Sequence, residues 1–280
     1  MTSRATEEDD TSSRAPSQAH EQLIARFTDA CSADNRVVAA FVGGSIARGE
    51  ADPYSDVDLC VVATDEAADD VFADRAAMVG HLGTPLFLED RGHQPPEVFV
   101  ILADGTDAEM FFIAEGRIKE MQVGSILTLL DRTGLLTNLE LPMRAPLSGD
   151  LASELRILAW FWHDVSHVIK ALGRGQLWWA AGEIEALRGY CVNLVRIEQG
   201  VEAGGEPYFK IDTEASTVAL ESLRSTFVTI EAEALAQAAS ELVAFFGSRG
   251  RPLAGAYGSE YPSELDLLMR RRLEALVERP

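Results

Sequence analysis

The first half of the chain alternates between short apolar runs and longer amphipathic segments. Leu23, Ile24 and Phe27 have helical spacing and predict a helix over residues 21–33, and residues 65–82 open with acids that favour a helix N-terminus. Gly105 indicates a hairpin between two of the apolar runs. The runs themselves predict strands at residues 37–42, 57–63, 86–88, 97–103 and 109–114. This half is therefore expected to form a small, twisted mixed sheet with flanking helices.

From about Leu151 onwards the apolar positions follow a helical period instead. Helices are predicted at residues 151–172, 177–199, 213–246 and 263–277, with glycine-rich breaks at 173–175 and 201–205. Pro142 and Pro146 interrupt both patterns and indicate a domain boundary. Residues 1–17 are polar and acidic and have little to bury, so we expect a disordered tail there. The prediction is an α+β fold, with a sheet domain at 18–145 and a C-terminal helical bundle at 146–280.

Candidate chemistry lies between the first two predicted strands. Gly43-Gly44-Ser45 ends the first apolar run, and Asp56 and Asp58 flank the start of the second. Residues two apart in a strand project to the same side, so the two carboxylates repel unless a cation lies between them. The glycines let the backbone approach a ligand, and Ser45 can open a helix whose N–H groups suit phosphate. The segment predicts a phosphate- and metal-binding site suited to nucleotidyl transfer.

Such a transfer also needs a base for the incoming hydroxyl, and a third acid would complete the metal site. The second strand of the predicted hairpin supplies candidates, because Asp107 and Glu109 share one of its faces. Glu109 lies inside the strand and Asp107 at its edge. Glu109 is therefore the better candidate, with Asp107 left open as the alternative.

The glycine–serine motif, its spacer and the Asp-Val-Asp strand resemble the nucleotidyltransferase superfamily typified by DNA polymerase beta. Further features are similar to the antibiotic nucleotidyltransferases, the lincosamide-modifying branch in particular. These are the turn between Gly44 and Asp56, the strand led by Glu109, the segment Leu129-Leu-Asp-Arg-Thr-Gly134 and the segment Arg174-Gly-Gln-Leu-Trp. The resemblance covers roughly residues 22 to 200 and implies the nucleotidyltransferase fold.

The resemblance also implies a reaction and roles for individual residues. Asp56 and Asp58 would ligate magnesium, two ions in all, and Glu109 would act as catalytic base, third ligand or both. The co-substrate would be an NTP, expected to be ATP, and the acceptor a hydroxyl of an antibiotic-like small molecule held by the helical domain. Pyrophosphate would be released. The residues implied to bind the nucleotide are Gly43, Gly44, Ser45, Arg48 and, from the first helix of the bundle, Lys170.

Composition narrows the range of partners. The formal net charge is −21 and no stripe of lysine and arginine is present, which argues against nucleic acid and favours a cationic small molecule as acceptor. The three cysteines are isolated along the chain, as free thiols of a reducing cytoplasm would be. No apolar run approaches the roughly 18 residues that span a bilayer, so we expect a soluble cytoplasmic protein without a membrane partner. The oligomeric state is left open, with a homodimer among the options.

His163 and His167 lie four residues apart on a predicted helix, which is the spacing of zinc-binding motifs. The glutamate neighbour of those motifs is missing and no third ligand is apparent from the sequence. No metal is therefore expected at this pair. The tryptophans near them are interpreted mainly as packing residues of the bundle.

Two other functions compete with transfer to a small molecule. One is a nucleotidyltransferase of the toxin–antitoxin type that modifies a protein or tRNA, and the long helical half counts against it. The other is a nucleotide-binding module without catalysis. The loss of one carboxylate would favour it, yet all three candidate acids are present.

Overall fold

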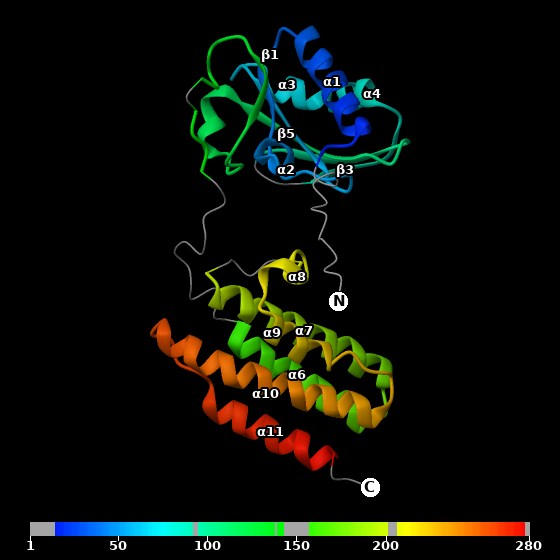
Figure 1. Ribbon diagram of the computed structural model, residues 1–280, viewed down its shortest axis with the longest axis vertical. Helices are drawn as coiled ribbons and strands as arrows, with labels where there is room; N and C mark the ends of the chain where they lie inside the picture. The colour runs from blue at the N-terminus through cyan, green and yellow to red at the C-terminus, as the bar shows by residue number, and fades with distance from the viewer. Residues whose placement is uncertain (1–14, 92–94, 138, 143–156, 201–205, 278–280) are drawn as a thin grey trace, which may run out of the picture. The chain divides into compact units, whose positions relative to one another are not determined.

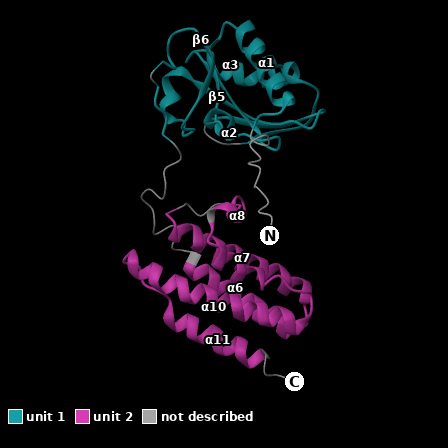
Figure 2. Ribbon diagram, viewed as in Figure 1, with its two compact units in different colours: residues 1–145 teal, residues 146–280 magenta. Residues whose placement is uncertain are grey.

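The computed structural model describes residues 15–91, 95–137, 139–142, 157–200 and 206–277. The chain divides into two compact units, residues 1–145 and residues 146–280, and each is described by itself (Figure 2). Most of the tail expected at residues 1–17 lies outside the described residues. Its last residue, Ser17, caps helix α1 (Gln18–Ala33), because the Ser17 hydroxyl oxygen accepts a hydrogen bond from the His20 N–H at 3.2 Å. No helix in the described ranges is long and apolar enough to cross a membrane.

A sheet forms the centre of unit 1 (Figure 1). It has six strands in the order β3-β4-β5-β2-β1-β6. β2 and β5 run parallel to each other, and every other neighbouring pair is antiparallel. The strands are β1 (Val37–Val42), β2 (Val57–Ala63), β3 (Pro85–Arg91), β4 (Glu97–Leu102), β5 (Asp107–Ala114) and β6 (Leu127–Asp131). The mixed sheet expected from the apolar runs is therefore present.

Both faces of the sheet are covered, which is why β1 is buried along its whole length. One face packs against α1, α3 (Ala68–Ala73) and α4 (Arg75–Leu82). The other face packs against a 3-10 turn (Glu115–Glu120) and the segment that follows it. Successive residues of a strand pack into the cores on opposite faces of the sheet. Val61 packs on the face covered by the helices, and Val62 packs on the other face.

Two predictions for unit 1 are corrected. The helix expected at residues 65–82 is two helices, α3 and α4, which meet at Asp74, whose carboxylate pairs with Arg36 at 2.8 Å. Asp65 precedes them, and its carboxylate accepts a hydrogen bond from the Gly116 N–H at 2.9 Å. The strand prediction missed the edge strand β6, whose last residues, Leu129 to Asp131, begin the segment that ends at Gly134. Asp131 at the end of β6 accepts the N–H groups of the two residues after Gly134, at 2.9 and 3.0 Å.

Unit 2 is a helical bundle. Its helices are α6 (Ile157–Gly173), α7 (Leu177–Glu198), α8 (Ile211–Glu214), α9 (Thr217–Arg224), α10 (Ala232–Ala256) and α11 (Ser263–Val277). Phe161 of α6 stacks on Phe246 of α10 with ring centroids 3.6 Å apart, and both belong to one apolar core. The first residues expected in the bundle, 151–156, lie outside the described residues.

The single helix expected at residues 213–246 is wrong, because three helices occupy this region. Ser216 caps α9, its hydroxyl oxygen accepting the Ala219 N–H at 3.3 Å. After α9 the chain leaves the helix at Thr226, whose hydroxyl donates to the Leu223 carbonyl oxygen at 2.6 Å and accepts from Arg188 Nε at 2.9 Å. A buried side-chain contact with another helix thus ends α9, and the apolar period alone does not reveal it.

Candidate active site

The glycine pair after β1 packs directly against Asp58. Helix α2 (Gly44–Arg48) begins here, with Gly43 as its N-cap. The Gly43 N–H donates to the Asp58 carbonyl oxygen at 2.9 Å, which fixes the turn on β2. Gly44 has φ +58°, and a Cβ atom there would lie 1.6 Å from Asp58 Oδ2. A side chain at position 44 would therefore displace the carboxylate, so glycine is required for the conformation and for the space.

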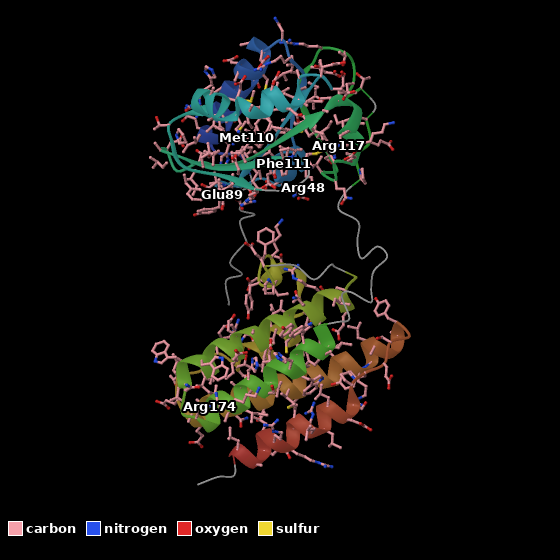
Figure 3. All side chains as sticks on the ribbon, turned by 180° about the vertical axis from the view of Figure 1, so that it is seen from behind. Arg48, Glu89, Met110, Phe111, Arg117 and Arg174 are labelled. Carbon is pink, nitrogen blue, oxygen red and sulfur yellow. The ribbon has the colours of Figure 1, made fainter. Side chains whose placement is uncertain are left out.

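Ser45 and Arg48 lie on the single turn of α2. The Ser45 hydroxyl is buried and has no hydrogen-bond partner among the described residues, which is costly for a polar group unless a ligand completes it. The half-buried Arg48 donates from Nε to Glu50 Oε2 at 2.7 Å (Figure 3). The positive charge of Arg48 favours the ionised form of Asp58 and so opposes part of the rise in the pKa of that residue. Helix α2 thus brings an unsatisfied hydroxyl and a cation to the same turn.

Three carboxylates converge beside this turn. Asp58 on β2 is directly opposite Glu109 on the parallel strand β5, and Asp56 lies just before β2. One carboxylate oxygen from each of the three lies within 4.8 Å of the others. Asp56 is exposed, while Asp58 and Glu109 are partly buried. Like charges at this distance disfavour ionisation unless a cation is shared among them.

The pKa values of the two partly buried acids respond to this crowding. Burial, followed by the charges of Asp56 and Glu109, raises the pKa of Asp58 from 3.8 to about 6. Burial and the charge of Glu97 raise the pKa of Glu109, although a hydrogen bond from Arg91 lowers it. Acids with raised pKa values that converge beside a glycine turn are typical of functional sites.

Arg91 is a site residue that the sequence did not reveal. It ends β3, and its Nη1 donates at 2.8 Å to Glu109 Oε1 and at 2.8 Å to Glu97 Oε1. Its guanidinium also lies over the Phe99 ring, 4.9 Å from the centroid. Glu97 is buried, so the shared arginine compensates its charge and orients Glu109 at the same time. The register of β3, β4 and β5 produces this arrangement, and no motif marks it.

Asp107, Lys170 and Arg174 were also singled out from the sequence, and each has a defined place within its own unit. Asp107 is at the start of β5, opposite Ile101, and is not one of the three clustered acids. Lys170 is exposed on α6 of unit 2, near Arg272 of α11. Arg174 lies in the predicted break at residues 173–175, which forms the turn between α6 and α7 (Figure 3).

Comparison with known proteins adds the identity of the domain. Residues 24–90 match the family model described as "Nucleotidyltransferase domain", and this range contains the glycine turn and both aspartates of the Asp-Val-Asp motif. A comparison with curated protein sequences gives no significant match.

Similar solved structures cover nearly the whole chain. An aminoglycoside 6-adenyltransferase from Bacillus subtilis is 13% identical, covers 93% of this chain and 98% of its own, and has a TM-score of 0.46. A nucleotidyltransferase-like protein from Exiguobacterium sibiricum is 10% identical, with coverages of 92% and 89% and a TM-score of 0.39. The family match, together with the glycine turn and the acids that follow it, shows that the chain carries a nucleotidyltransferase domain.

Proposed function

We propose that the protein transfers a nucleoside monophosphate from an NTP, expected to be ATP, to a hydroxyl of a cationic small molecule in a magnesium-dependent reaction. One observation carries this proposal: carboxylate oxygens of Asp56, Asp58 and Glu109 lie within 4.8 Å of one another. They lie beside a turn in which Gly44 leaves the space that the Asp58 carboxylate occupies. The unsatisfied Ser45 hydroxyl on the same turn supports a role in binding the phosphates of the nucleotide.

The donor set fits magnesium. Carboxylate oxygens are the ligands that Mg²⁺ prefers, and Asp56, Asp58 and Glu109 would hold the two ions that we propose. Bound magnesium would neutralise charge on the reacting phosphate and on the departing pyrophosphate. The raised pKa of Asp58 supports this assignment, because a cation would relieve the repulsion that helps to raise it.

The protein's own groups supply the proton transfer and the positioning. The acceptor oxygen attacks the α-phosphorus, the bond from that phosphorus to the bridging oxygen breaks, and pyrophosphate leaves. Glu109 takes the hydroxyl proton. Its Oε1 is held by Arg91, whereas its Oε2 accepts no hydrogen bond from any residue that the structure describes. In the metal-free protein, burial and the charge of Glu97 raise the pKa of Glu109.

Binding of the nucleotide is assigned to the turn and to two cations. The backbone of Gly43 and Gly44 and the Ser45 hydroxyl would contact the terminal phosphates, and Arg48 would offset their charge. Lys170 belongs to unit 2, and we propose that it reaches the triphosphate in the assembled enzyme. The acidic balance of the chain, −21, supports an acceptor that carries an amine.

One assay tests the whole proposal. Pyrophosphate release is measured with each NTP across a panel of hydroxylated small molecules, with amine-bearing and uncharged members, with and without magnesium. We expect release only when an acceptor, an NTP and magnesium are all present, and none from the Asp58→Asn variant. Modification of tRNA or of a protein, with no release on any small molecule, would contradict the proposal.

A further inference from the structure

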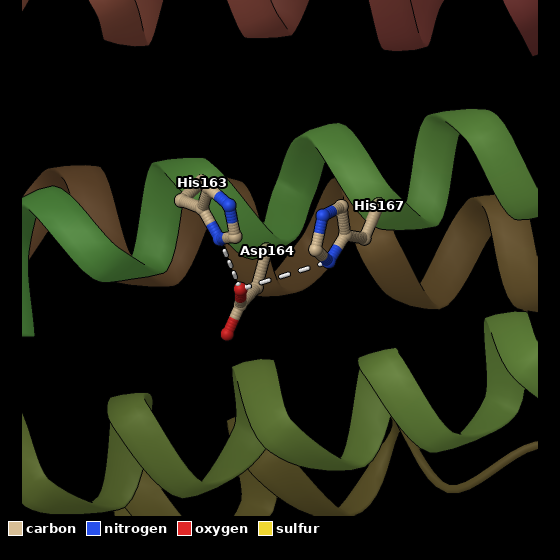
Figure 4. Close-up of side chains that lie close together, drawn as sticks. All are labelled: His163, Asp164 and His167. Atoms are coloured by element: carbon tan, nitrogen blue, oxygen red, sulfur yellow. Dashed lines mark hydrogen bonds and ion pairs between the residues drawn. The ribbon is translucent and has the colours of Figure 1, made fainter.

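A second group of possible metal ligands lies in unit 2, on helix α6. His163, Asp164 and His167 each offer one ligand atom, and these atoms all lie within 4.8 Å of one another (Figure 4). His163 Nδ1 is 2.7 Å from Asp164 Oδ1, and His167 Nδ1 is 4.0 Å from the same oxygen. The third ligand that the sequence analysis did not find is thus the residue next to His163.

Helix α7 contributes a fourth group. Glu183 Oε1 lies 3.7 Å from His167 Nδ1, so this imidazole is close to a carboxylate of each helix. In a four-coordinate zinc site, bonds of about 2.0 to 2.1 Å place neighbouring ligand atoms about 3.4 Å apart. The two separations at His167, 4.0 Å to Asp164 and 3.7 Å to Glu183, are close to that value.

Residues of α7 hold both carboxylates in place. The Tyr190 hydroxyl donates to Asp164 Oδ2 at 2.9 Å, which leaves Oδ1 for the histidine side. The Trp179 indole N–H donates to Glu183 Oε1 at 2.7 Å. Hydrogen bonds of this kind orient the ligands in known metal sites.

The two carboxylates also lack a permanent positive partner. Within the described ranges, no lysine or arginine makes an ion pair with Asp164 or Glu183, and the imidazoles beside them carry a charge only when protonated. Side chains of His163 and His167 are 48% and 29% exposed, so an ion has access from solvent. A divalent cation would supply the charge that the apo cluster is missing.

We propose that His163, Asp164, His167 and Glu183 bind a divalent transition-metal ion of the zinc class. Two imidazole nitrogens favour zinc, cobalt or nickel over magnesium, which prefers oxygen ligands alone. The site differs in this respect from the three acids of unit 1, which offer oxygen only. Because its ligands come from α6 and α7, the bound ion would join these two helices of the bundle.

The test is a titration of the full-length protein with Co²⁺ in the presence of excess Mg²⁺, followed by visible absorption. The excess magnesium competes with cobalt for the oxygen-only site proposed in unit 1, and the cobalt spectrum reports imidazole ligation. We expect one Co²⁺ per chain, displaced by one Zn²⁺, and the same result for Asp58→Asn. His163→Gln and His167→Gln should each weaken binding by at least about tenfold.

The matched control is His81→Gln, which changes an exposed histidine at the end of α4 in unit 1 and should leave binding unchanged. Circular dichroism and Tm of the apo variants establish that they are folded. The proposal is overturned if the wild-type protein shows no cobalt spectrum in excess Co²⁺. It is equally overturned if both α6 variants, folded, bind Co²⁺ as tightly as the wild type.

Discussion

Asp58 and Glu109 occupy directly opposite positions on the parallel strands β2 and β5, although they lie far apart in the chain. A parallel pair places the two side chains at the same height and on the same face of the sheet. Asp56 joins them from just before β2, so the three acids meet at one end of the strand pair. This register explains why a short motif and a distant strand contribute to one site.

Asp56→Asn and Asp58→Asn are each expected to abolish nucleotidyl transfer without unfolding the protein. Each change removes one negative charge from the proposed magnesium ligands while keeping the size of the side chain. Pyrophosphate release and Mg²⁺ affinity measure the effect. Asp69→Asn is the matched control, since it removes the same charge from an exposed position on α3. Wild-type turnover in either active-site variant would refute the metal assignment.

The pKa of Asp58 predicts a pH-dependent difference in stability between wild type and Asp58→Asn, without metal. Because this pKa is raised from 3.8 to about 6 on folding, the folded state binds the proton more tightly. The resulting stability is present below about pH 4 and is lost as the pH rises through about 6. The free energy of unfolding of the wild type should fall relative to the variant by at most about 3 kcal/mol over this window.

Urea denaturation at several pH values measures this difference. The same measurement is then repeated with Mg²⁺ present. At pH 7, magnesium should restore stability to the wild type and have less effect on the variant. A constant difference between the two proteins from pH 4 to pH 7 would show that Asp58 ionises normally in the folded protein.

Glu109→Gln should lower turnover by at least about 10²-fold, whereas Asp107→Asn should have a much smaller effect. A positioned general base contributes about 10² to 10⁴ in rate, and Glu109 belongs to the acid cluster while Asp107 does not. Single-turnover rates with saturating nucleotide and acceptor separate this effect from binding. If Asp107→Asn lowered turnover strongly and Glu109→Gln only slightly, Asp107 would be the third acid instead.

Gly44→Ala is expected to reduce activity strongly and to destabilise the protein by about 1 kcal/mol or more, because a Cβ at φ +58° is strained and would collide with Asp58 Oδ2. Gly80→Ala is the control. Position 80 lies within α4, and a Cβ added there would meet no other atom within 4 Å, so alanine should be neutral or slightly stabilising. Unfolding midpoints and turnover are compared for the two variants, and equal effects would argue against the fit between Gly44 and Asp58.

Much of the sheet could be predicted from the sequence because its central strands are buried on both faces. Such strands are continuous apolar runs, and β1 and β2 have the bounds expected for them. Edge strand β6 is partly exposed and short, so its pattern did not predict a strand. The breaks at Asp74 and Thr226 depend on partners far along the chain, Arg36 and Arg188, which local periodicity does not contain.

The residues of the candidate sites also fall into those that the sequence predicts and those that only the fold brings together. Asp56, Asp58 and Glu109 could be proposed together because strand alternation and a known motif constrain them. Arg91 could not be proposed, since its contact with Glu109 requires the pairing of β3 with β4 and of β4 with β5. Glu183 likewise approaches His167 only through the packing of α7 against α6.

The charge of the acceptor can be tested through its dependence on salt. A protein of net charge −21 should attract a cationic acceptor by long-range steering, and this attraction should weaken between about 0.05 and 0.5 M salt, as the Debye length shortens. kcat/KM for the amine-bearing acceptor is therefore expected to fall steeply over this range. Nucleotide and metal binding also respond to salt, so an uncharged analogue of the acceptor, measured with the same NTP, is the necessary control. The difference between the two slopes isolates the charge of the acceptor, and equal slopes would mean that the enzyme recognises the acceptor by shape and hydrogen bonding instead.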